Sequence, residues 1–435
     1  MSFTRKIGQH FIWRGLYFGS TLLSNILFAR ILGADNSGSF FYIVNNISLL
    51  ILFAGFCLET SFIFYGSSNQ IAAGKLLVAG ITWSAVAAGA GAVFGMVGIS
   101  SPAFSFPPWL WAVFTASYVL INYCSALFNV QHDFKTYNLI LALVNLIFIV
   151  GLVAFEVAPK KMEGIFSFVD TDINGLISLS YIFTVITQGL AILIFWLIRN
   201  RTESFAWPSQ REWLLLFRYA SLSLTANVVF FLVYRVDYWF IEYFRKDQYL
   251  LGNYIQVSKL GQLFILIPSM VATVIFPATA LTSQSAIREE LIRLCRIFSN
   301  LYLLVLLLIS SVSYWLFPFV FGPSFDQMYG AFIALVPGIV ALSVQSLLAA
   351  WFAGKNKVRY NVYGALMALV IIVVLNLVLI PPFGIIGAAL SSSIGYIAYC
   401  LFCIYQFRKE EGRAGSFGVL VKRSDFVWIK NALGF

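Results

Sequence analysis

The chain has 435 residues, of which 60% are hydrophobic and only 11% are charged. Soluble domains carry about 25% charged residues, so most of this surface is expected to face lipid rather than water. The formal net charge of +10 does not indicate nucleic-acid binding, because the basic residues lie in short segments between apolar runs. The composition therefore excludes a soluble enzyme and a nucleic-acid-binding protein.

Apolar runs long enough to cross a bilayer follow one another along almost the whole chain. A spanning helix needs about 20 mostly apolar residues, and clusters of Gly, Pro and Asn mark many of the boundaries between runs. The first run continues to Leu32 and is too long for a signal peptide, so we expect it to be the first span. The sequence predicts an all-α membrane protein with about twelve transmembrane helices, at 9–32, 38–65, 76–99, 108–130, 137–157, 173–198, 213–241, 250–277, 297–318, 328–352, 360–381 and 385–407.

Lys and Arg are distributed unevenly between the two sides of the predicted helices. With the N-terminus placed inside, 21 of the 28 basic residues fall on the inner side, six fall on the outer side, and Lys259 lies within a span. Cytoplasmic connections of membrane proteins carry an excess of Lys and Arg. We therefore expect both termini to lie in the cytoplasm (N-in/C-in).

Short motifs recur at equivalent places in the two halves of the chain. Gly38-Ser39-Phe40 opens the second predicted span and Gly252-Asn253-Tyr254 opens the eighth, 214 positions later. The connection at 133–138 resembles the one at 356–361, 223 positions later. Six spans return the chain to the inner side, so the repeat is expected to be parallel. The predicted division is an N-terminal six-helix bundle at 1–200, a cytoplasmic linker at 201–212, a C-terminal six-helix bundle at 213–407 and a cytoplasmic tail at 408–435.

Several of these motifs resemble those of a known family. The run Ala29-Arg30-Ile31-Leu32-Gly33, followed by Gly38-x-Phe40, is similar to the opening of the polysaccharide-export flippases. These are the Wzx-type O-antigen and exopolysaccharide translocases, in the superfamily that includes MATE drug exporters and lipid II flippases. In the second half the family pattern is matched by Asp237, Gly252-x-Tyr254, Pro268, Phe276-Pro277 and Gly354-Lys355-Asn356-Lys357.

The resemblance implies two six-helix bundles around a central cavity in the cell inner (plasma) membrane. It also implies a cargo, an undecaprenyl-diphosphate-linked oligosaccharide, which is turned from the cytoplasmic to the outer leaflet. Besides this cargo and the membrane lipids, the expected partners are a polysaccharide polymerase and a chain-length regulator, and nucleic acid is not expected. The chain departs from the lipid II flippases, which carry two further helices.

Charged side chains within the predicted spans are the candidates for a functional site, because a charge is costly in hydrocarbon. Arg235 and Lys259 lie equally far from the turn near position 247, so they are expected at one depth, with Asp237 beside Arg235. Arg and Lys replace the water around a phosphate. We predict that the three residues line a net-positive site for the anionic part of the cargo. A structural pair, or snorkelling of the side chains to the interface, is the alternative.

Arg14 and Glu59 form a second candidate pair. They lie at nearly equal distances from the first outer turn, near position 36, so they are expected at the same depth near the inner side of the membrane. We include them among the substrate-binding residues, and a purely structural pair is again the alternative.

The sequence contains no catalytic triad, P-loop, dinucleotide-binding fingerprint or metal motif, so catalytic residues, metals and cofactors are not expected. Of the five Cys, four lie in apolar runs and none has His at metal spacing, which predicts buried thiols. A MATE-type cation or drug antiporter is the alternative within transport, but it should carry deep acidic residues. A membrane-embedded polysaccharide polymerase or glycosyltransferase is the alternative from another class, although the longest outer connection, 158–172, is short for a catalytic loop.

Overall fold

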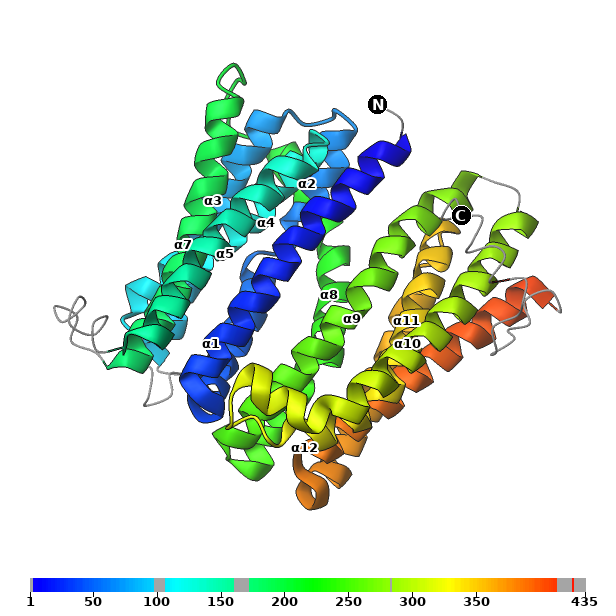
Figure 1. Cartoon of the computed structure of the whole chain (residues 1–435). Coiled ribbons are helices and arrows are strands. Elements are labelled where there is room, and N and C mark those ends of the chain that lie inside the picture. Colours follow the sequence, from blue (N-terminus) through cyan, green and yellow to red (C-terminus); the bar gives the residue numbers. More distant parts are fainter. Residues whose placement is uncertain (1–2, 98–105, 160–171, 282–283, 413–424, 426–435) are drawn as a thin grey trace. The chain divides into compact units, whose positions relative to one another are not determined.

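The structure is a computed structural model that describes residues 3–97, 106–159, 172–281, 284–412 and 425. In these ranges every regular element is a helix, and the long helices are labelled in Figure 1. Their bounds are α1 Phe3–Ala54, α2 Leu58–Ser67, α3 Ala73–Val97, α4 Pro108–Val130, α5 Phe134–Val157, α7 Ile173–Arg199, α8 Gln210–Arg245, α9 Gln248–Leu281, α10 Gln284–Phe321, α11 Met328–Gly354 and α12 Arg359–Glu411.

Two of these helices each contain a bend that divides them into two spans. A straight α1 of 52 residues would measure roughly 78 Å, far more than the roughly 30 Å of a bilayer core. It bends at Gly33, whose φ of 73° is a left-handed conformation that only glycine adopts readily. The 53-residue α12 bends in the same way at Gly384, with φ of 56°, just after Pro381 and Pro382.

The span count agrees with the sequence prediction. Ten helices of the described chain are long and apolar enough to cross a membrane, and two of them, α1 and α12, each supply two spans. Their outer surfaces are apolar, as on α10, where Leu304, Leu307 and Leu308 are all more than half exposed. The prediction of an all-α membrane protein with about twelve spans is therefore confirmed.

The second span is interrupted, which the sequence analysis did not predict. Instead of an unbroken helix over 38–65, α1 ends at Ala54 and α2 begins at Leu58, with positive φ at Phe56 and Cys57. A break inside a membrane leaves backbone carbonyls without helical partners, and these must be satisfied within the protein. Here Trp83 Nε1 donates to the Ala54 carbonyl at 2.7 Å. Tyr123 Oη donates to the Gly55 carbonyl at 2.5 Å.

The chain divides into two compact units. Unit 1 comprises Met1–Val228 with Val320–Gly322, and unit 2 comprises Val229–Phe319 with Pro323–Phe435, so the boundary falls inside α8. The domain limits predicted from the sequence, at 1–200 and 213–407, stay a prediction.

Unit 1 is held together by close helix packing and by hydrogen bonds between spans. Asn145 on α5 donates to Thr21 Oγ1 on α1 at 2.9 Å, and Gln188 on α7 donates to Asn145 Oδ1 at 2.8 Å. At its other end, Arg30 of the Ala-Arg-x-Leu-Gly motif pairs with Glu156 at the end of α5, at 2.9 Å. Polar contacts of this kind add to van der Waals packing where lipid supplies no hydrophobic driving force between helices.

Unit 2 is built around α11, which packs against both α9 and α12. Pro337 interrupts the hydrogen-bond ladder inside α11. Next to it, Ser393 of α12 approaches so closely that a Cβ on Gly338 would lie 2.7 Å from the Ser393 Cα. Ser393 Oγ donates to the Ala334 carbonyl at 2.6 Å and accepts from the Gly338 amide at 3.3 Å. The glycine therefore permits a close crossing at which the serine bridges the two backbone groups.

Candidate functional site

Asp237 lies in the core of unit 2, with only 1% of its surface exposed. Tyr254 on α9 donates its hydroxyl to Asp237 Oδ2, and Ser392 Oγ on α12 donates to the same oxygen at 3.1 Å. The carboxylate thus joins three helices of unit 2. A buried carboxylate needs such donors, because leaving it unpaired in a low-dielectric interior is costly.

Arg235 and Lys259 have a different environment from Asp237. Residues two apart on a helix point in different directions, so Arg235 and Asp237 occupy different faces of α8. Arg235 and Lys259 are both partly exposed, and the charge of Arg235 acts on Lys259 across α8 and α9. The Arg235 guanidinium also lies 5.4 Å from the centre of the Phe231 ring. The predicted three-residue site therefore separates into a buried carboxylate and a pair of partly exposed cations.

Arg14 and Glu59 are both partly exposed in unit 1, and no ion pair joins them within the described chain. The Arg14 guanidinium lies 5.2 Å from the Phe18 ring centre, while Glu59 occupies the first turn of α2. The expectation of equal depth assumed an unbroken second span. The interruption at Gly55–Cys57 removes that assumption, because the residues after it no longer continue the line of α1.

Two hydrogen-bond partners of Asp237 were not identified as site residues from the sequence. Tyr254 belongs to the recurring Gly-x-aromatic motif, which indicates the internal repeat and the family resemblance but not a hydrogen bond to Asp237. Ser392 lies in the run Ser391-Ser392-Ser393, and all three of these serines are buried in the apolar α12. Three consecutive serines in a spanning helix were the available signal, because buried hydroxyls need partners.

Five of the cations expected on the inner side of unit 2 are in ion pairs. At the end of α12, Glu411 pairs with Lys355 at 2.5 Å and with Arg288 at 3.5 Å, while Glu410 pairs with Lys357 at 2.6 Å. Asp425 pairs with Arg296 at 2.8 Å and with Arg293 at 3.4 Å. These residues bind the inner ends of α10, α11 and α12 to one another and to Asp425.

In the described ranges, the cysteines and the other potential metal ligands form no metal-binding cluster. All five cysteines are free and buried, as the sequence predicted. No group of three or more His, Cys, Asp or Glu residues there is arranged to hold a metal ion.

The twelve apolar spans of the described chain, in two units and with charged side chains inside the spanning helices, are the architecture of a multi-pass membrane protein. The comparisons with known proteins agree, although no family model matches the chain. It is 22% identical over 230 residues to the probable low-salt glycan biosynthesis flippase Agl15 of Haloferax volcanii. This match covers 51% of the chain and 48% of Agl15, so it spans about half the length of that relative.

Two solved structures have a similar fold over nearly the whole chain. One is the lipid II flippase MurJ in an inward closed conformation, with a TM-score of 0.68 at 12% identity, covering 97% of this chain and 89% of MurJ. The other is an inward-facing multidrug resistance MATE transporter of the MOP superfamily, with a TM-score of 0.67 at 15% identity, covering 92% and 95%. The chain has the fold that these solved structures share. The match to Agl15 agrees with the resemblance to glycan flippases that the sequence indicated.

Proposed function

We propose that the chain is a flippase that turns an oligosaccharide linked to undecaprenyl diphosphate from the cytoplasmic to the outer leaflet of the cell inner membrane. It acts as a transporter and not as an enzyme. The observation that carries this proposal is the presence of two partly exposed cations, Arg235 on α8 and Lys259 on α9, on spanning helices that the hydrogen bond between Tyr254 and Asp237 joins.

The charge of this pair suits a diphosphate. Placing Arg or Lys at the centre of a spanning helix costs about 2.5–3.5 kcal/mol on insertion scales, so a cation on each of two neighbouring spanning helices needs a compensating role. One oxygen of the neighbouring Asp237 carboxylate, Oδ2, accepts hydrogen bonds from Tyr254 and Ser392. The two cations place positive charge on neighbouring helices, which suits an anionic ligand, and the Arg235 guanidinium lies 5.4 Å from the centre of the Phe231 ring.

The fold alone does not separate a flippase from the MATE-type antiporter, since the two solved structures match almost equally well, with TM-scores of 0.68 and 0.67. The charge pattern favours the flippase, because two cations on facing helices suit an anion rather than a cationic drug. The glycan-biosynthesis role of Agl15 points in the same direction. A polysaccharide polymerase and a chain-length regulator are the proposed protein partners.

The test is complementation of a strain that lacks its glycan flippase. We expect the double variant Arg235→Ala, Lys259→Ala to lower surface glycan at least tenfold at unchanged membrane abundance, because the diphosphate loses both charge partners. Arg218→Ala is the matched control, since Arg218 is an exposed cation on the same helix, and it should export normally. Normal export by the double variant would contradict the proposed site. Changed drug tolerance with no glycan export by the wild type would identify an antiporter instead.

A further inference from the structure

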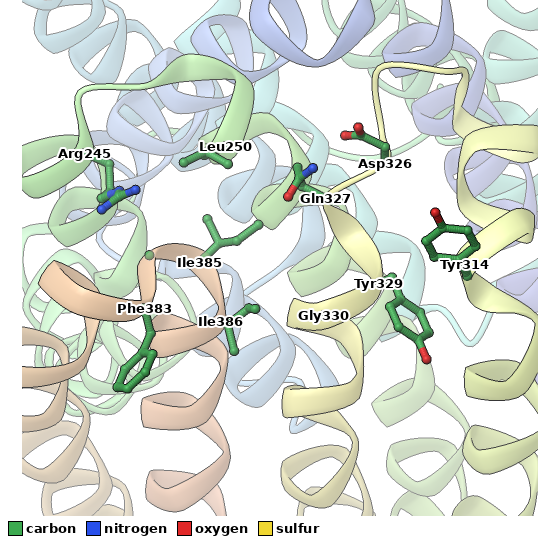
Figure 2. A pocket seen from close by; sticks show the side chains of 11 residues that line it. Arg245, Leu250, Tyr314, Asp326, Gln327, Tyr329, Gly330, Phe383, Ile385 and Ile386 are labelled. Carbon is green, nitrogen blue, oxygen red and sulfur yellow. The ribbon is translucent and has the colours of Figure 1, made fainter.

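Unit 2 contains a pocket of about 420 Å³ at one end of its helices. Its walls come from the end of α8 and the start of α9, from the connection leading into α11 with the facing side of α10, and from the bend of α12. These are the connections that the charge distribution assigns to the outer side of the membrane. Figure 2 shows Arg245 on one side of this pocket, Tyr314 and Tyr329 on the other, and Ile385 and Ile386 between them.

Two opposite charges line the pocket without pairing with each other. Arg245 is exposed, and its Nη1 donates to the Pro381 carbonyl at 3.3 Å. Asp326 is exposed and accepts the Tyr249 hydroxyl. Within the described chain neither residue belongs to an ion pair. Each therefore keeps hydrogen-bonding capacity directed at whatever enters the pocket.

The equivalent arginine of unit 1 forms an ion pair, unlike Arg245. Arg30 lies 215 positions before Arg245, at the corresponding end of the first span, and reaches the end of α5, where Glu156 pairs with it at 2.9 Å. Arg245 reaches the corresponding end of the eleventh span, but meets a backbone carbonyl there instead of a carboxylate. The repeat thus keeps the arginine in both units, and among the described residues the one in unit 2 has no carboxylate partner, so it can bind a ligand.

The rest of the lining is rigid and partly apolar. Asn253 fixes the connection into α11, accepting from the Gln327 amide at 3.1 Å and donating to the Ser324 carbonyl at 3.1 Å. Tyr314 and Tyr329 meet edge to face with ring centres 5.7 Å apart, and Tyr314 is 59% exposed. A concave site with aromatic walls and a few fixed polar groups is typical of small-molecule recognition, and this volume falls within the usual range.

The balance of charge identifies the class of ligand. One Arg and one Asp cancel, so the pocket offers no net attraction for a diphosphate. An acyl chain would leave both charges desolvated without partners. A saccharide meets each feature, because its hydroxyls both donate and accept, and its C–H faces pack on aromatic rings. The chemistry therefore fits neutral, polyhydroxylated groups.

We propose that this outer pocket of unit 2 binds a sugar residue of the translocated glycan, so that the sugar is held at the outer side while the lipid-linked diphosphate is still bound elsewhere. The proposal rests on the proposed flippase function and adds a second, charge-balanced subsite to the cationic one. Arg245, Asp326 and Gln327 supply the hydrogen bonds, and the tyrosines supply the stacking surface.

The test uses the full-length protein in nanodiscs and a thiol introduced by Ile386→Cys. Because the five native cysteines are buried, a maleimide should report mainly on this position. The probes are free di- and trisaccharides of hexoses and N-acetylhexosamines, with inorganic pyrophosphate and glycan-free lipid as comparisons. We expect at least one saccharide to slow labelling. Arg245→Gln or Asp326→Asn in the same background should raise the concentration needed about tenfold, the usual effect of losing a hydrogen bond to a charged group.

Two residues near the pocket provide matched control variants. Lys246→Gln removes a neighbouring exposed cation and Tyr243→Ala removes an exposed tyrosine of α8, and neither residue lines the pocket. Both should leave protection unchanged. Protection by pyrophosphate alone, protection by no saccharide, or equal protection in Arg245→Gln and Asp326→Asn would overturn the proposal. Glycan export by the wild type, measured separately, shows whether the flippase function itself has failed.

Discussion

The inner connections of the two units occupy the same place in the repeat but have opposite charge. In unit 1, the connection between α4 and α5 carries Asp133, which pairs with Arg199 at the end of α7. In unit 2, the connection between α11 and α12 carries Lys357, which pairs with Glu410 at the end of α12, 2.6 Å away. In each unit the fourth connection is thus bound to the end of the sixth span. The repeat preserves the position of the ion pair and not the residues that form it.

A second difference lies in the core of each unit, at the Gly-x-aromatic motif. Phe40 of unit 1 packs against Phe28 and Tyr181, with ring centres 5.0 and 5.3 Å away. Tyr254 of unit 2 occupies the same repeat position but donates its hydroxyl to Asp237. One unit therefore has an aromatic junction where the other has a buried polar one. We expect unit 2 to be the unit more specialised for binding the cargo, since it also holds the cation pair and the outer pocket.

Removing the buried carboxylate should give the largest effect on stability. Asp237→Ala leaves the hydroxyls of Tyr254 and Ser392 without their acceptor, at about 1–3 kcal/mol for each buried unsatisfied group. We expect a lower melting temperature in detergent and lower membrane abundance. Asp237→Asn keeps an acceptor oxygen and should lose less. Equal melting temperatures for the wild type and Asp237→Ala would show that the carboxylate does not hold the three helices together.

Much of the fold was predictable from the sequence, because twenty-residue apolar runs, Gly33 and the Pro381-Pro382 pair are local signals. The interruption at Gly55–Cys57 was not predictable, because a helix tolerates one glycine in an apolar run. The side chains that satisfy the carbonyls at the break, Trp83 and Tyr123, also lie far along the chain. The candidate site was less predictable. Counting from a turn placed Arg235 and Lys259 together, but only the three-dimensional contacts show that Asp237 belongs to Tyr254 and Ser392.

Exchanging the two aromatic residues of the repeat tests the contrast between the junctions. Tyr254→Phe removes one hydrogen bond to a buried carboxylate, which is worth about 1.5–3 kcal/mol. Phe40→Tyr places a hydroxyl in an aromatic cluster, where lack of a partner costs about 1–3 kcal/mol. Both variants should melt at lower temperature than the wild type in the same detergent. Equal melting temperatures for Phe40→Tyr and the wild type would show that unit 1 tolerates a polar junction. The two junctions would then differ in sequence but not in what their structures can accept.

Removing the inner ion pairs should have the smallest effects on stability, and the size of the effect should differ between the two units. Arg199 is 53% exposed, so its pair with Asp133 is expected to contribute no more than about 1 kcal/mol. Glu411 is only 8% exposed and pairs with both Lys355 and Arg288, so its loss leaves two partly buried cations unpaired. Glu411→Gln should therefore lower the melting temperature more than Asp133→Asn does.

The charge-reversed double variant Lys357→Glu, Glu410→Lys gives unit 2 the polarity of unit 1. It should recover stability lost in Lys357→Glu alone, because the pair is re-formed with its signs exchanged. A double variant no more stable than that single variant would show that the polarity of this connection, and not only its pairing, is fixed by the surrounding charges of unit 2.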